Sequence, residues 1–136
     1  MQSRSWPIKQ LPGLQPEHLR QLAELNIVTT ADILRRGKTQ AGLHQLASQL
    51  HLPLRYVQKW AALSDLARVP PVGCRYSGLL LHAGIASAIQ LSNASPGQLH
   101  KQLLRLHVTT LTRSDLCPSP DEVVHWIQAA KHLISS

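Results

Sequence analysis

Phenylalanine is absent from this 136-residue chain, and the other aromatic residues number only three tryptophans and two tyrosines. Leucine and alanine are abundant, whereas strand-forming residues are scarce, so the composition favours helices around an aliphatic core. Only two cysteines occur, Cys74 and Cys117, and they belong to no Cys-x-x-Cys pattern. This excludes a disulfide scaffold and a cysteine-based zinc site.

Long apolar runs are also missing. The most apolar stretch, Gly78 to Leu91, is interrupted by His82 and Gln90 and is too short to span a membrane. The N-terminus lacks the apolar segment of a signal peptide. We therefore expect a soluble cytoplasmic protein with no membrane span.

Acidic residues are few, with seven Asp and Glu against fourteen Lys and Arg, which gives a net charge of +7. This balance makes a polyanion such as nucleic acid, or an acidic protein, the first partner to consider. The carboxylates are scattered along the chain, and the only adjacent pair, Asp121 and Glu122, is explained by helix capping. We predict no enzyme activity, because two-metal nucleases, for example, need several convergent carboxylates.

The eight histidines do not indicate a metal site. Zinc ligands on one helix usually lie three or four residues apart. Here the pairs lie seven residues apart: His44 and His51, His100 and His107, and His125 and His132. We therefore predict neither a metal nor a cofactor.

The chain resembles itself at a shift of 58 residues, which places Leu11-Pro12-Gly13-Leu14 over Val69-Pro70-Pro71-Val72. Later, Trp60 matches Trp126 at a shift of 66, and the added residues fit the loop-like stretch 109–118. Such self-similarity indicates a duplicated helical unit, with chance resemblance of amphipathic helices as the alternative. We predict an all-α fold with an N-terminal extension (1–10) and two repeats (11–66 and 67–134) that share one core, or form one compact domain.

Helix start and stop signals support this layout. Proline or capping residues predict helix starts, and Asn26, Gly37 and Gly84 predict helix ends. Leu22, Leu80, Trp60 and Trp126 are expected to be buried. The predicted starts lie at Pro16, Thr30, Thr39, Pro53, Gly73, Ser87, Ser95-Pro96 and Ser119-Pro120.

The stretch from Ser64 to Ile85 resembles a helix-hairpin-helix motif, with a helix, a short hairpin, a second helix and then Gly-Ile. Proteins with this motif hold a nucleic-acid phosphate against hairpin amides and the N-terminus of the second helix. From Leu11 to about Leu133, the chain is similar to an uncharacterised cyanobacterial family of tandem helix-hairpin-helix proteins, which resemble modules of DNA repair proteins. This resemblance implies an architecture but no activity.

The two hairpins depart from the motif in different ways. In the second, Pro71 replaces the first glycine and offers no N–H, while Gly73 is kept. In the first, Gly13 is kept, but Gln15 replaces the second glycine and Glu17 places a carboxylate where phosphate would be repelled. The first hairpin is therefore interpreted as structural. The hairpin residues given a structural role are Pro12, Gly13, Gln15, Pro70 and Pro71.

The resulting hypothesis is sequence-independent binding of nucleic-acid backbone, duplex DNA rather than RNA, through the second hairpin. The alternative is a protein-interaction or assembly module in which degenerate hairpins only join helices. For the basic cluster near position 36, an equal interpretation is stabilisation of a helix C-terminus. Trp6 and Tyr76 are candidates for surface contact. The predicted nucleic-acid-binding residues are Gly73, Cys74, Arg75, Tyr76, Arg68, Arg35, Arg36 and Lys38.

Overall fold

A computed structural model describes residues 3–106 and 117–135, and within these residues the protein is all-α. The only strand-like pairing there is an isolated bridge between Pro7 and Thr29. The elements are η1, a 3₁₀ helix (Ile8–Gln10), and the α-helices α1 (Pro16–Glu24), α2 (Thr30–Arg36), α3 (Gln40–Leu50), α4 (Leu54–Ala67), α5 (Gly73–His82), α6 (Ala88–Ser92), α7 (Pro96–Leu106) and α8 (Pro120–Ser135).

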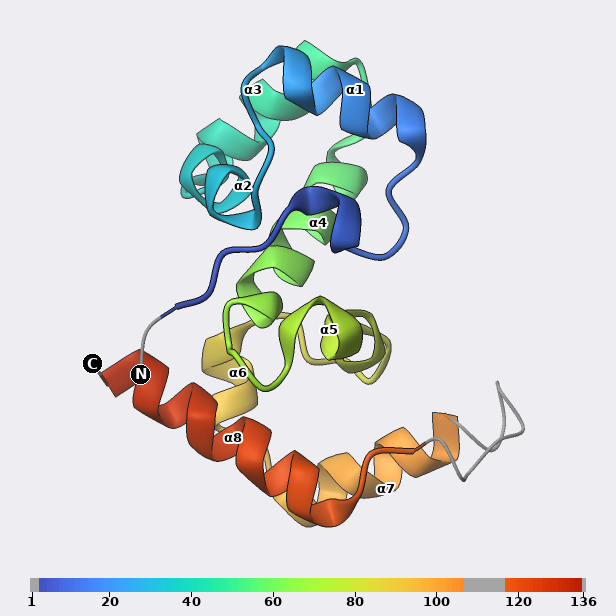
Figure 1. Cartoon of the computed structure of the whole chain (residues 1–136), viewed down its shortest axis with the longest axis vertical. Helices are drawn as coiled ribbons and strands as arrows, with labels where there is room; N and C mark the ends of the chain where they lie inside the picture. The colour runs from blue at the N-terminus through green and yellow to red at the C-terminus, as the bar shows by residue number, and fades with distance from the viewer. Residues whose placement is uncertain (1–2, 107–116, 136) are drawn as a thin grey trace.

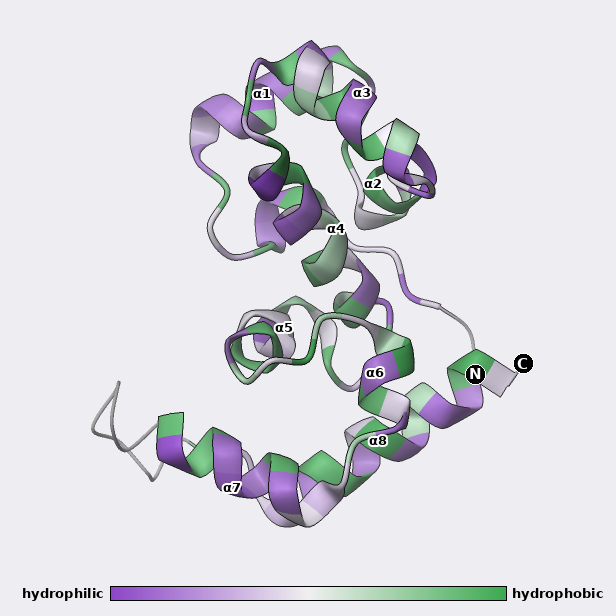
Figure 2. Ribbon diagram, turned by 180° about the vertical axis from the view of Figure 1, so that it is seen from behind, coloured by the Kyte–Doolittle hydropathy of each residue, from purple (hydrophilic) through white to green (hydrophobic). Residues whose placement is uncertain are grey.

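Helix α4 connects the two halves of the molecule (Figure 1). In the first half, α2 and α3 pack on α4; in the second, α6 and α7 pack on α8. Helix α5 packs on α4 and so joins the halves. Figure 2 shows hydrophilic and hydrophobic residues alternating around α7 and α8, as expected for amphipathic helices.

Most of the predicted helix starts are confirmed. Thr39 and Ser87 cap α3 and α6, since their hydroxyls accept the amides of Gly42 and Gln90 at 3.0 Å. The Ser119 hydroxyl accepts the amide of Glu122 at 3.2 Å. The predicted left-handed helix ends are also present, because φ is +63° at Asn26 and +91° at Gly84.

The cap of α2 was misassigned by one residue. Thr29, and not Thr30, accepts the amide of Asp32, and the Asp32 carboxylate accepts the amide of Thr29 in return. Thr30 is buried, and its hydroxyl accepts the backbone amide of Trp6 at 3.0 Å. The hydroxyl of Thr30 is thus engaged by the N-terminal segment, and the hydroxyl of Thr29 caps α2.

The buried side chains form two clusters, which corrects the expectation of a single aliphatic core. One cluster lies among η1 and α1–α4 and contains Trp60; the other lies among α5–α8 and contains Trp126. Both tryptophans, together with Leu22 and Leu80, are buried as predicted. The clusters meet at α4 and α5, since each helix contributes residues to both.

The N-terminal residues lie against the rest of the chain. The backbone amide of Trp6 donates to the Thr30 hydroxyl, and the backbone amide of Thr30 donates to the Trp6 carbonyl. The Ile8 amide donates to the Val28 carbonyl at 3.0 Å. Further back, the Arg4 amide donates to the Arg68 carbonyl at 2.9 Å. Residues 3–8, called here the N-terminal strap, therefore connect the start of α2 with the end of α4.

Candidate nucleic-acid interface

The second hairpin, residues 69–72, joins α4 to α5 and is covered by the strap. Gly73 has φ of +55°, and a Cβ atom placed there would lie 3.1 Å from Cζ2 of Trp6. The indole Nε1 donates to the Ala67 carbonyl at 2.7 Å. Trp6 thus packs against the Cα of Gly73, and it is half-buried there rather than on the open surface.

The hairpin residues predicted to bind phosphate differ in accessibility. Gly73 and Cys74 are buried, and the Gly73 amide already donates to the Val69 carbonyl at 3.0 Å. Arg75 is exposed, and its guanidinium lies 5.0 Å from the ring centre of Tyr76. Tyr76 in turn packs on Trp126, with 4.9 Å between ring centres. In this arrangement Arg75 is the hairpin group best placed to meet an anion.

Pro70 and Pro71 lie in the turn itself and are partly buried. In the first hairpin, Pro12 packs toward Gly78 of α5, where an added Cβ would lie 3.1 Å from Pro12 Cγ. Gln15 lies immediately before α1, and its amide donates to Nδ1 of His18 at 3.3 Å. Pro12 thus lies against α5, and Gln15 contacts the first turn of α1.

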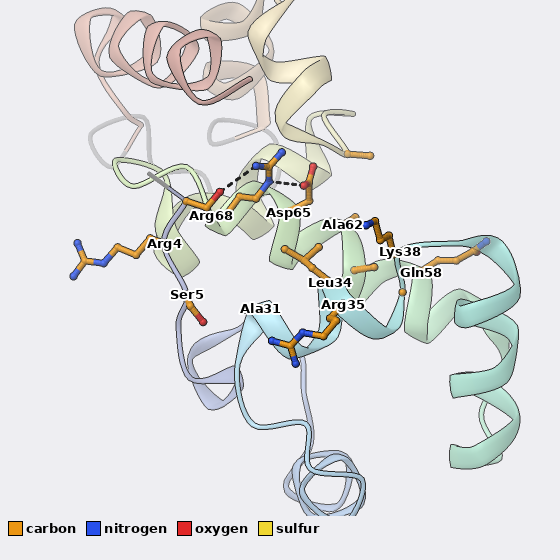
Figure 3. A pocket seen from close by; sticks show the side chains of 14 residues that line it. Arg4, Ser5, Ala31, Leu34, Arg35, Lys38, Gln58, Ala62, Asp65 and Arg68 are labelled. Atoms are coloured by element: carbon orange, nitrogen blue, oxygen red, sulfur yellow. Dashed lines mark hydrogen bonds and ion pairs between the residues drawn. The ribbon is translucent and has the colours of Figure 1, made fainter. Parts of the chain in front are cut away.

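Three of the predicted basic residues line one groove (Figure 3), and none of the hairpin residues 69–72 lines it. Arg35 lies in the last turn of α2, Lys38 follows Gly37, the C-cap of α2, and Arg68 is the C-cap of α4. The groove has a volume of about 860 Å³. Its other lining residues are Ser3, Arg4, Ser5, Ala31, Leu34, Gly37, Gln58, Ala61, Ala62, Asp65 and Ala86.

The charge in this groove is mainly positive. Asp65 is the one acidic lining residue, and its two oxygens are already engaged, one by Nε of Arg68 at 2.7 Å and one by the amide of Ala88 at 2.8 Å. Arg68 also donates to the Ser3 hydroxyl at 3.2 Å. Arg35 contacts Asp32 at 3.1 Å, but 72% of its side chain is exposed. Lys38 is exposed and has no ion-pair partner among the described residues.

For the groove, sequence reasoning named one basic residue that does not line it and did not find three residues that do. Arg36 does not line the groove, because its guanidinium is turned to the side chain of Gln49. Ser3, Arg4 and Ser5 do line it, although the N-terminal residues were expected to be only an extension. They contact Arg68, and the neighbouring Trp6 contacts Thr30 and Ala67; a local sequence pattern gives no signal for such distant contacts.

Among the described residues, the thiols and histidines do not gather into a metal site. Burial raises the pKa of the Cys74 thiol, and burial together with the Glu122 carboxylate raises that of Cys117. In the described part of the chain, no three His, Cys, Asp or Glu side chains lie close enough together to hold a metal ion. His107 and most of the loop expected at 109–118 lie outside the described residues.

None of the described helices is both long and apolar enough to cross a membrane.

The fold and the groove define a basic, all-α protein. A family model described as a domain of unknown function, DUF4332, matches residues 12–133, and the chain belongs to this family. No curated protein and no solved structure matched the chain.

Proposed function

We propose that this protein binds the sugar-phosphate backbone of nucleic acid, duplex DNA rather than RNA, and does not read the base sequence. The observation that carries the proposal is that Arg4, Arg35, Lys38 and Arg68 all line one groove. These residues come from three separate segments, so their proximity is a product of the fold and not of a charged run in the sequence.

The chemistry of the groove suits a phosphate backbone. Long basic side chains bind phosphate oxygens and release condensed counterions, which supplies affinity but no sequence preference. The acidic residue of the groove is already neutralised by Arg68 and a backbone amide. Lys38 has no ion-pair partner among the described residues, and Arg35 and Arg4, although they contact Asp32 and Trp6, are exposed to an outside anion.

The arrangement of helices supports a second part of the proposal, that the chain consists of two tandem helix-hairpin-helix repeats. The pairing of α2 and α3 with α4 is matched by that of α6 and α7 with α8. Helix α4, the turn at 69–72 and α5 have the order of the motif. In the first repeat, only the short η1 precedes the hairpin. Because Trp6 covers Gly73, we assign the main phosphate contacts to the groove and an auxiliary one to Arg75.

The test is anisotropy of a labelled DNA duplex at several salt concentrations. The double variant Arg35→Glu with Lys38→Glu should weaken binding by about 100-fold or more at low salt, since each reversal replaces an attraction by a repulsion. The matched control, Lys101→Glu with Lys131→Glu, changes the net charge equally but lies outside the groove. Equal losses in both variants would show that only overall charge matters and would overturn the groove assignment.

A protein-interaction module is the second candidate, and the burial of Gly73 beneath Trp6 favours it. A hairpin whose glycine is covered by a side chain of the same protein has the role of joining two helices and binds no ligand at that glycine. The same titration distinguishes the candidates. If the wild-type protein binds neither duplex DNA nor RNA at low salt, the backbone-binding proposal fails and the interaction module is retained.

A further inference from the structure

The hydroxyl of Ser3 lies beside a cation of the basic groove. Ser3 lines the groove, and Nη1 of Arg68 donates to its Oγ at 3.2 Å, although the two residues are 65 positions apart in the sequence. Ser3 is exposed, and residues 3–5 belong to no helix or strand. The hydroxyl is therefore accessible to another enzyme and, at the same time, adjacent to an arginine that the fold holds in place.

Arg68 is positioned to pair with an anion on Ser3. Its Nε donates to one oxygen of Asp65 at 2.7 Å, and the amide of Ala88 donates to the other oxygen at 2.8 Å. Only 23% of the Arg68 side chain is exposed, so water screens its charge less than that of a fully exposed arginine. The guanidinium carries more N–H donors than its contacts with Asp65 and Ser3 use, and the rest suit the oxygens of a phosphate.

A phosphate group on Ser3 would change the charge of the groove at this point. It carries about two negative charges near pH 7 and several strong acceptor oxygens. The carboxylate of Asp65 repels it, but that carboxylate is already paired with Arg68 and with the amide of Ala88. Arg4, Arg35, Lys38 and Arg68 are the basic residues that line the groove. One phosphate would therefore cancel about half of their charge.

Ser5 provides a comparison within the same segment. It also lines the groove and is exposed. In Figure 3, however, its hydroxyl points away from Arg68. A phosphate on Ser5 would add the same charge without starting from a contact with this arginine.

We propose that Ser3 is a phosphorylation site, and that its phosphate pairs with Arg68 and weakens the binding of nucleic acid in the groove. The effect on nucleic acid rests on the proposed function, whereas the ion pair does not. The modifying enzyme is a protein kinase that uses a nucleoside triphosphate. Oγ of Ser3 bonds to the γ-phosphorus as the bond from that phosphorus to the β,γ-bridging oxygen breaks. The nucleoside diphosphate leaves with the electron pair, and a carboxylate of the kinase takes the hydroxyl proton.

The first experiment measures the ionisation of the phosphate. Phosphoserine is incorporated at position 3 of the full chain during translation, and ³¹P NMR follows its second ionisation at about pH 6. Pairing with Arg68 favours the dianion, so the pKa of this phosphate should be lower beside Arg68 than in the Arg68→Gln protein. Arg68→Lys, which keeps the charge, should retain a lowered pKa. Phosphoserine at position 5 should titrate equally with and without Arg68. Equal pKa values at position 3 in the wild-type and Arg68→Gln backgrounds would overturn the ion pair.

The second experiment measures the affinity for a labelled DNA duplex at low salt by anisotropy. Phosphoserine at position 3 should weaken binding by about tenfold or more, since it brings negative charge into the groove. Phosphoserine at position 95, an exposed residue outside the groove, is the control for net charge and should have a smaller effect. Ser3→Ala should bind as the wild type does. Equal losses at positions 3 and 95 would overturn the effect on the groove. If the unmodified protein binds no duplex while the phosphate on Ser3 pairs with Arg68, only the proposed function fails.

Mass spectrometry of the protein isolated from the cells that make it tests the modification itself. A peptide that carries phosphate on Ser3 is expected in part of the population. A Ser3 peptide that is found without phosphate at every stage of growth would overturn the assignment of Ser3 as a modification site.

Discussion

Gly73 and Gly84 share a left-handed backbone but have different surroundings. An added Cβ at Gly84 meets nothing within 4 Å, whereas at Gly73 it lies 3.1 Å from the Trp6 ring. Gly84→Ala should therefore lower the free energy of unfolding by about 1–2 kcal/mol, the cost of the left-handed backbone alone. Gly73→Ala should cost more, because the strap must also shift. Urea denaturation of both variants measures the difference, and equal losses would show that the Trp6 contact places no steric demand on position 73.

Asp32 gives the stability a defined dependence on pH. The backbone amide of Val28 donates to its carboxylate and, with the Thr29 and Arg35 contacts, holds its pKa below the ordinary value of 3.8, although partial burial opposes this. A carboxylate with a lowered pKa in the folded state stabilises the protein above the unfolded-state pKa, and this contribution disappears as the pH falls through the folded-state pKa.

Asp32→Asn should accordingly lower the free energy of unfolding at pH 7 by about 1 kcal/mol. The difference from the wild type should shrink once the pH falls below 3.8, since the wild-type carboxyl then becomes protonated. Urea midpoints at pH 7 and at acid pH provide the measurement. A difference that stays constant over this range would mean that the carboxylate charge is not what stabilises the start of α2.

The strap is the element whose position sequence reasoning could not supply. Helix starts were predictable because proline, serine and threonine act on amides within three residues. The contact of Trp6 with Ala67 spans 61 residues, and it determines both the covering of Gly73 and the N-terminal wall of the groove. For the same reason Arg35, Lys38 and Arg68 could be named from the sequence as basic candidates, but their shared groove could not.

Removal of the Trp6 side chain tests what the strap does to the second hairpin. Trp6→Ala should lower stability by about 3 kcal/mol, the typical cost of truncating a large packed side chain. If the hairpin amides near Gly73 can bind phosphate, uncovering them should raise duplex affinity in the protein that is still folded. Trp6→Phe keeps an aromatic cover but loses the bond to the Ala67 carbonyl, so it should keep wild-type affinity. Anisotropy below the unfolding temperature compares the three proteins, and a weaker Trp6→Ala would show that the strap belongs to the binding surface.

At the scale of the whole molecule, two hydrophobic clusters meet along two shared helices. Helix α4 contributes Trp60 and Leu63 to one cluster and Leu66 to the other, and α5 likewise contributes Cys74 to the first and Leu80 to the second. Neither half can unfold without exposing residues of a helix that the other half needs. The arrangement therefore predicts a single cooperative transition, as small domains usually show.

Two core truncations, one in each cluster, test this cooperativity. Leu46 and Leu91 are both fully buried, in the first and second cluster respectively. Leu46→Ala and Leu91→Ala should each lower the free energy of unfolding by about 2–5 kcal/mol. If the clusters unfold together, each variant should shift the whole transition, and NMR signals of the indoles of Trp60 and Trp126 should disappear at the same urea concentration. A Leu91→Ala protein that loses the Trp126 signal while the Trp60 signal persists would show two independent folding units, and the coupling assigned to α4 and α5 would then be wrong.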